Sequence, residues 1–183
     1  MLLPMEHSEP TTETRRIHEG RIINLREDTV QTPSGRLAKR EIVEHKGAVC
    51  VVPVLADGRV ILVRQYRKPA EAALLEIPAG GLEKGEVPLD AARRELEEEC
   101  GYHAARLAPI FSCYLAPGYS TEIIHGFLAE DLTPTATNPD EDENVEVEIY
   151  TLDELLPMID DNRISDAKTI CGVLTLLRRR KQS

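Results

Sequence analysis

Four glutamates are crowded into the five positions that follow Arg94. On a helix, Glu95 and Glu99 lie four residues apart, and like charges at that spacing destabilise the helix by about 0.2–0.5 kcal/mol. At about 100° per residue, Glu95, Glu98 and Glu99 project within one arc of the helix surface. Carboxylate oxygens without imidazole or thiolate neighbours are the donors that Mg²⁺ and Mn²⁺ prefer. The spacing therefore indicates a divalent-cation site.

A solvated helix face is the competing explanation for these glutamates. Arg94 can pair with Glu98, and Arg93 with Glu97, at four-residue spacing, which would neutralise part of the charge. The residues before the helix favour a site, because the glycines of residues 80–86 form a permissive loop in which the backbone can approach a ligand closely. We therefore expect a binding site rather than a solvated surface.

The helix that carries the glutamates is expected at residues 88–100. Pro88 suits the first turn of a helix, and Gly101 suits its exit. Apolar residues recur at three- and four-residue steps and form one narrow stripe that faces the core. The stripe consists of Leu89, Ala92, Leu96 and Cys100.

The rest of the chain is expected to form mainly strands, followed by two helices. The run 47–55 is almost continuously apolar, as in a central strand that is covered on both faces. Asp57-Gly58 is a strong hairpin signal, and the polar residues 130–144 predict a long loop. Mixed strands with three helices predict an α/β or α+β sandwich. The other expected strands are 27–32, 36–44, 59–67, 74–78, 107–114, 121–129 and 145–150, and the helices are 151–159 and a last one capped by Ser165-Asp166.

The composition narrows the class of partner. A net charge of −10 argues against nucleic acid, because phosphate binding relies on clustered Lys and Arg. No apolar run approaches the length that spans a bilayer, and residues 1–16 lack the pattern of a secretory signal. Four separated cysteines without a C-x-x-C motif are expected to be reduced and buried. The sequence therefore predicts a cytoplasmic protein with no nucleic-acid or membrane partner.

Together with the glycines before it, the glutamate helix resembles the Nudix box. The match comprises Gly80, five residues, Glu86, seven residues, and then Arg-Glu-Leu-x-Glu-Glu-x-Gly-Tyr at 94–102, which covers nine defined positions. The resemblance implies an α/β (α+β) Nudix-type αβα sandwich with a mixed sheet, plus an N-terminal strand-rich subdomain. The expected parts are a flexible tail at 1–13, the N-terminal β subdomain at 14–45 and a Nudix hydrolase domain at 46–180.

Other stretches are similar to the ADP-ribose pyrophosphatases of this superfamily. They are Arg64-Gln65-Tyr66-Arg67, then Glu76-Ile77-Pro78-Ala79-Gly80, the upstream residues 40–45, and Pro117, which lies 15 residues beyond Tyr102. The resemblance implies Mg²⁺-dependent hydrolysis of the diphosphate of ADP-ribose to AMP and ribose 5-phosphate, with Mn²⁺ as the alternative ion. Two other functions stay open. One is hydrolysis of another nucleoside diphosphate sugar, or of a broad range of them, and the other is a catalytically inactive nucleotide-sensing Nudix module.

The resemblance also implies roles for residues in and near the box. The metal ligands would be Glu95, Glu98 and Glu99 with the backbone carbonyl of Ala79, and Glu98 is also assigned to catalysis. The general base would come from the acidic loop before the late strand, as Glu143 or, second, as Glu141. Structural roles within the box fall to Gly80, Glu86, Arg94 and Gly101, with Arg94 pairing with a neighbouring carboxylate.

Substrate contacts follow from the same resemblance. Arg67 is similar to an arginine that contacts the diphosphate, and Glu76 to a residue beside it. Arg40 and Glu41 correspond to an adenine-binding edge; because the chain has no tryptophan, Arg40 or Tyr66 would stack on the purine. ADP-ribose members are dimers that exchange N-terminal strands, so the expected partners are a small nucleoside diphosphate sugar and a second copy of the chain. Leu115 and Ala116 would border the terminal ribose.

Overall fold

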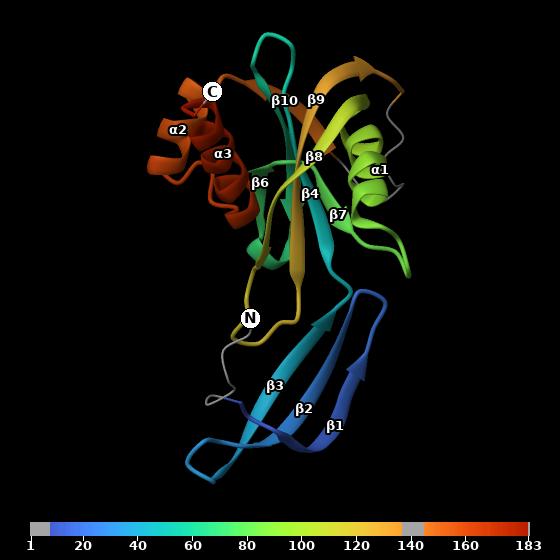
Figure 1. The fold of residues 1–183 in the computed structure, drawn as a ribbon, viewed down its shortest axis with the longest axis vertical. Coiled ribbons are helices and arrows are strands. Elements are labelled where there is room, and N and C mark those ends of the chain that lie inside the picture. Colours follow the sequence, from blue (N-terminus) through green and yellow to red (C-terminus); the bar gives the residue numbers. More distant parts are fainter. Residues whose placement is uncertain (1–7, 137–144, 183) are drawn as a thin grey trace. The chain divides into compact units, whose positions relative to one another are not determined.

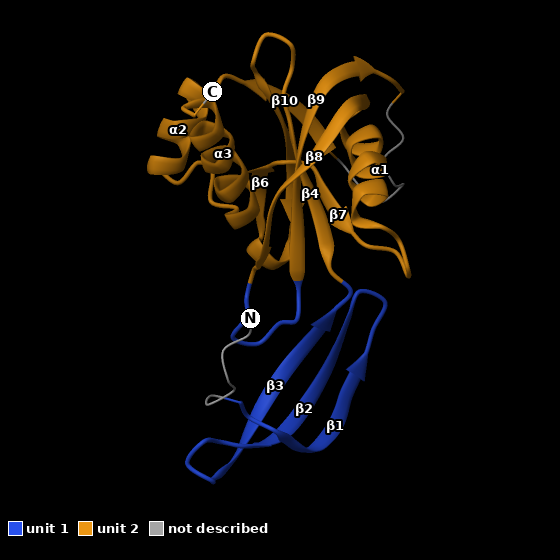
Figure 2. Ribbon diagram, in the orientation of Figure 1, with its two compact units in different colours: residues 1–46, 116–122 blue, residues 47–115, 123–183 orange. Residues whose placement is uncertain are grey.

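The computed structural model describes residues 8–136 and 145–182. Glu141 and Glu143, the two residues predicted to supply the base, lie outside these ranges. The described residues form two compact units (Figure 2). The first contains the residues up to 46 together with 116–122, and the second contains 47–115 and the residues from 123 onward.

The first unit is an antiparallel sheet of three strands, β1 (Thr11–Glu19), β2 (Ile23–Gln31) and β3 (Leu37–His45), in that order. The segment 116–122 joins this unit because the Val43 N–H donates to the Tyr119 carbonyl at 2.8 Å and the Thr121 N–H donates to the Val43 carbonyl at 3.0 Å. β1 begins at Thr11, so its first three residues fall within the stretch 1–13 that was expected to be a flexible tail. Threonines favour extended backbone, and the Thr14 hydroxyl donates to Asp28 on β2 at 2.9 Å.

The second unit contains two sheets (Figure 1). In one, the order is β7-β4-β9-β8, with β4 parallel to β9 and the other neighbours antiparallel. In the other, the order is β10-β5-β6, and all neighbours are antiparallel. The bounds of these strands are β4 (Ala48–Pro53), β5 (Val60–Arg67), β6 (Ala72–Glu76), β7 (Ala79–Gly81), β8 (Tyr102–Tyr114), β9 (Ile123–Pro134) and β10 (Val145–Tyr150), with a 3₁₀ turn η1 (Lys68–Ala70) between β5 and β6.

Helices cover both sides of the sheets of this unit. Helix α1 (Pro88–Cys100) lies on one side, and α2 (Leu152–Asp160) and α3 (Ala167–Arg180) lie on the other (Figure 1). All six residues of β4 are buried, and their side chains alternate: Val49 and Val51 pack in the core under α1, whereas Cys50 and Val52 pack in the core under α2 and α3. An apolar run without alternation is what a strand between two helix layers requires. The predicted αβα sandwich with a mixed sheet and a strand-rich N-terminus is confirmed.

Helix α1 has the predicted bounds, and its ends have the predicted chemistry. Pro88 is the first helical residue, and Gly101 ends the helix in the left-handed conformation at φ 69°. Three other expectations are wrong. β8 begins at Tyr102 rather than 107, and β9 runs to Pro134, into the predicted loop 130–144, because the two strands pair along their whole length. Gly80 and Gly81 are not in a loop, since β7 pairs with β4.

Candidate active site

The four glutamates of α1 are divided between the core side of the helix and its outer side. Glu95 and Glu99 are buried, with 7% and 4% of their surface exposed, and Glu98 is half-buried. Glu97 projects away from them and pairs with His103 at 2.6 Å. The helical spacing therefore separates one outward carboxylate from three that lie on or beside the buried face.

Arg94 binds three carboxylates of the box, one before the helix and two on it. Its Nε and Nη2 donate to the two oxygens of Glu86 at 3.1 and 3.2 Å. Its Nη1 donates both to Glu95 Oε1 at 2.7 Å and to Glu98 Oε2 at 3.0 Å. The hydrogen bond from Arg94 holds the pKa of Glu86 below its ordinary value, and the hydrogen bond to Glu86 raises the pKa of Arg94. The predicted pairing of Arg94 with neighbouring carboxylates is thus present.

Strand β7 lies against the same helix, close to the glutamates. The Ala79 N–H donates to Glu99 Oε2 at 3.0 Å. A Cβ atom on Gly80 would overlap the carboxylate of Glu95, so only glycine permits this approach. Glu95 and Glu99 therefore both meet the backbone of residues 79–80, which β4 holds in register.

The donor chemistry of this place fits a hard divalent ion, because every donor is an oxygen. Glu95 and Glu98 already share one cationic nitrogen, which shows that both oxygens can face a single positive charge. Within residues 8–136 and 145–182, however, no three His, Cys, Asp or Glu side chains are grouped to hold a metal ion. The ligand set Ala79, Glu95, Glu98 and Glu99 accordingly stays a prediction.

A second cluster contains Arg67 and Glu76, the residues predicted to lie near the diphosphate. The guanidinium of Arg67 donates to both oxygens of Glu76, at 2.9 and 2.8 Å. Burial raises the pKa of Glu76, but the hydrogen bond from Arg67 and the charge of Lys168 more than offset this effect, so its pKa lies below the ordinary value. The negative charge of Glu99 also contributes to raising the pKa of Arg67, so this cluster interacts electrostatically with a carboxylate of α1.

The sequence reading missed the residues of α3 that complete the second cluster. Lys168 donates to Glu76 Oε2, and it pairs with Asp166 at 3.1 Å. The Ile77 N–H donates to the hydroxyl of Thr169 at 2.8 Å. The available signal was a lysine in the first turn of an amphipathic helix, two residues after Asp166 of the predicted cap, but its partner lies 92 residues away in the chain.

The predicted adenine edge lies in the first unit. Arg40 donates to both oxygens of Glu9, at 2.9 and 2.6 Å, and a cavity of about 330 Å³ is lined by residues that include Arg40, Glu41, Pro117 and Tyr119. Ala116 belongs to the same unit. Leu115 and Tyr66 belong to the second unit, where Leu115 packs against the core and Tyr66 is 57% exposed. The stacking and ribose roles of these residues stay predictions.

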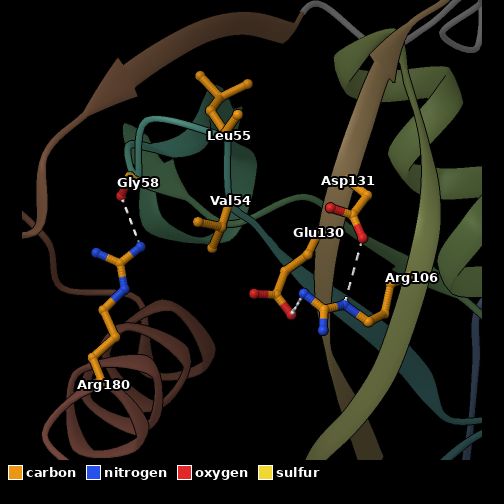
Figure 3. Close-up of a pocket in the computed structure, with 8 residues that line it drawn as sticks. Val54, Leu55, Gly58, Arg106, Glu130, Asp131 and Arg180 are labelled. Carbon is orange, nitrogen blue, oxygen red and sulfur yellow. Dashed lines mark hydrogen bonds and ion pairs between the residues drawn. The ribbon is translucent and has the colours of Figure 1, made fainter. Parts of the chain in front are cut away.

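Another cavity, of about 240 Å³, lies in the second unit and contains none of the predicted site residues (Figure 3). Its charged groups are engaged with protein atoms: Arg106 pairs with Glu130 at 3.1 Å and with Asp131 at 3.7 Å, and Arg180 donates to the Gly58 carbonyl at 3.0 Å. We assign no ligand to this cavity.

Among the helices of the described ranges, none is both long enough and apolar enough to cross a membrane.

Comparisons with known proteins identify the families and relatives to which this chain is similar. A family model described as NUDIX domain matches residues 44–172, and one described as nucleoside diphosphate sugar hydrolase N-terminal domain matches residues 9–43. An ADP-ribose pyrophosphatase of Bacillus subtilis (strain 168) is 47% identical over 167 residues, which are 90% of each chain. A methanol dehydrogenase activator of Bacillus methanolicus is 45% identical over 167 residues, again 90% of each chain. A crystal structure of an ADP compounds hydrolase has a TM-score of 0.84 at 23% identity and covers 95% of both chains, which supports the fold.

Proposed function

We propose that this chain, which belongs to the Nudix family, hydrolyses ADP-ribose to AMP and ribose 5-phosphate with a divalent metal ion. The observation that carries the proposal is the packing of α1 against β7. This packing places Glu95 and Glu99 at the backbone of residues 79–80 and directs Glu95 and Glu98 toward one cationic nitrogen. The relative from Bacillus subtilis, named an ADP-ribose pyrophosphatase, supports the choice of substrate.

Glu95, Glu98 and Glu99, with the carbonyl of Ala79, would hold the ion, and Mg²⁺ is the first choice with Mn²⁺ second. When bound, the ion neutralises phosphate oxygens and acidifies the attacking water. Arg94 already balances Glu95 and Glu98, so these two carboxylates would have to share their charge between Arg94 and the ion. Glu86 would keep Arg94 in place during this exchange, because it accepts from two other nitrogens of the guanidinium.

Water would attack one phosphorus of the diphosphate, and the P–O bond on the far side would break to release AMP and ribose 5-phosphate. Arg67 would bind the diphosphate oxygens, since a guanidinium matches them with two parallel hydrogen bonds. Glu143, or in second place Glu141, would accept the proton of the water; both lie outside the described residues. Glu98 would also take part in catalysis. It is half-buried, whereas Glu95 and Glu99 are buried.

The remaining assignments belong to the same proposal. Arg40 and Glu41 would contact the adenine, Leu115 and Ala116 would border the terminal ribose, and Glu76 would support Arg67. The chain would act as a cytoplasmic homodimer, without nucleic-acid or membrane partners.

Hydrolysis of another nucleoside diphosphate sugar is the second candidate, and the match of residues 9–43 to a nucleoside diphosphate sugar hydrolase domain favours it. A panel of ADP-ribose, ADP-glucose, GDP-mannose and diadenosine polyphosphates, with Mg²⁺ and kcat/KM compared, separates the two. ADP-ribose is expected to have the highest value by at least about tenfold, which corresponds to about 1.4 kcal/mol of transition-state discrimination. Equal values across the panel would overturn the ADP-ribose assignment, and no turnover of any compound would favour a nucleotide-sensing module.

A further inference from the structure

Glu76 lies between two cations, and only one of them can move easily. Glu76 and Lys168 are 1% and 7% exposed, whereas the side chain of Arg67 is 37% exposed. Arg67 holds the carboxylate by two hydrogen bonds, and Lys168 holds Oε2 of the same carboxylate. Arg67 therefore has access to solvent and to a ligand, while Lys168 is confined beside Glu76.

Lys168 is confined because the start of α3 is fixed at several points. Lys168 also pairs with Asp166, the N-cap of α3, at 3.1 Å. Asp166 accepts from the backbone N–H of Thr169 at 2.9 Å and from its hydroxyl at 2.5 Å. Thr169 in turn accepts from the Ile77 N–H, so the start of α3 is tied to the residue that follows Glu76.

A buried carboxylate that loses its only cationic partner is strongly destabilised. If Arg67 were the sole partner of Glu76, a substrate diphosphate would have to draw Arg67 away against this cost. With Lys168 also in contact, Glu76 keeps a countercharge when the guanidinium turns toward the ligand. Two cations on one carboxylate thus make one of them available for binding.

We propose that Lys168 is a positioning residue: it neutralises and holds Glu76, so that Arg67 can be shared with the diphosphate of the substrate. This inference rests on the proposed function, in which Arg67 binds the diphosphate. Lys168 itself does not touch the reacting atoms in this proposal. It acts through Glu76, and its effect is on substrate binding more than on the chemical step.

The test compares Lys168→Met, which removes the charge and keeps most of the side-chain length, with Lys168→Arg, which keeps the charge. Lys68→Met is the matched control, because Lys68 pairs with Glu71 while both side chains are more than 70% exposed. Lys168→Met is expected to raise KM for ADP-ribose about tenfold and to change kcat less than about threefold, a binding effect of one charge-assisted hydrogen bond. Lys168→Arg is expected to restore most of the loss, and Lys68→Met to leave KM unchanged.

A double-mutant cycle separates positioning from packing. In a Glu76→Gln background, Lys168 still pairs with Asp166 but no longer has the Glu76 carboxylate to neutralise, so adding Lys168→Met is expected to change KM less than about twofold. An equal rise of KM in both backgrounds would overturn the inference. If Lys168→Met alone does not fold, Glu76→Gln and Glu76→Gln/Lys168→Met carry the same test, since a further rise of KM in the double variant contradicts it.

Binding of ADP, measured by calorimetry without turnover, distinguishes failure of this inference from failure of the proposed function. A wild-type protein that hydrolyses ADP-ribose, with the affinity for ADP unchanged in Lys168→Met, would refute the role of Lys168 alone. A wild-type protein that does not hydrolyse ADP-ribose, with ADP affinity reduced about tenfold in Lys168→Met, would refute the proposed reaction and leave the role of Lys168 standing.

Discussion

Replacing Arg94 by methionine should destabilise the metal-free protein and increase its response to Mg²⁺. Glu95 Oε1 and Glu98 Oε2 both lie within 3.0 Å of Arg94 Nη1. The two oxygens are therefore separated by no more than about 6 Å, at which two unit charges repel by about 3 kcal/mol at an effective dielectric constant of 20. Arg94 and Glu98 are 31% and 33% exposed, so solvent screening reduces the net loss in the free energy of unfolding to about 2 kcal/mol.

The assay is urea unfolding of wild type and Arg94→Met, each with EDTA and with Mg²⁺. In Arg94→Met the guanidinium that Glu95 and Glu98 share is gone and the ion can take its place, so Mg²⁺ should stabilise the variant by more than it stabilises wild type. Arg93→Met is the matched control, because Arg93 is on the same helix and donates to the Ala104 carbonyl. Its loss should stay near about 0.5 kcal/mol. A loss for Arg94→Met no larger than that of the control, or the same Mg²⁺ response in variant and wild type, would refute the reasoning.

Three further predictions concern the surroundings of the site. Gly80→Ala forces a methyl group into the Glu95 carboxylate and should lower the free energy of unfolding, measured by chemical unfolding, by about 1–3 kcal/mol. Gly81→Ala is the control, because a methyl group there meets no atom within 4 Å, and equal losses for the two variants would contradict the close packing. The folded-state pKa of Glu76 is lowered, so its contribution to stability is present above the unfolded pKa of about 4.3 and is lost as the pH falls through the folded value. The difference in unfolding free energy between wild type and Glu76→Gln should therefore shrink on acidification, and a difference that grows toward low pH would show the opposite sign. Thr169→Val leaves the Ile77 N–H without its acceptor and should cost about 1–3 kcal/mol. Thr12→Val, at an exposed hydroxyl, should cost little, and matching losses for the two variants would argue against the tie between α3 and Ile77.

Local signals in the sequence were sufficient for the helix that carries the site. Pro88 and Gly101 determine where α1 begins and ends, and both act on near neighbours in the chain. Ala92, Leu96 and Cys100 of the predicted apolar stripe are buried, but Leu89, its fourth member, is 37% exposed. The apolar run of β4 likewise predicted a strand buried on both faces. The division of the glutamates into Glu97 and the other three followed from helical periodicity alone.

Features that depend on distant pairing were not predictable in this way. The segment 116–122 joins the first unit through backbone hydrogen bonds to Val43, and nothing in its own residues shows this. β9 extends to Pro134 because β8 pairs with it, although residues 130–134 read as a loop by composition. Nothing in the local sequence distinguishes Lys168 from the other lysines of the chain, because its role depends on Glu76, which lies 92 residues away.

Release of AMP from ADP-ribose by wild type and by Glu99→Gln tests most directly whether the carboxylates of α1 make this chain an ADP-ribose hydrolase. The glutamine oxygen can still accept from the Ala79 N–H, so the variant should fold with little loss of stability. With Mg²⁺, wild type should release AMP, and kcat/KM of Glu99→Gln should fall by at least about a thousandfold, or about 4 kcal/mol. Turnover by a folded Glu99→Gln protein at the wild-type rate, or none by wild type, would contradict the account.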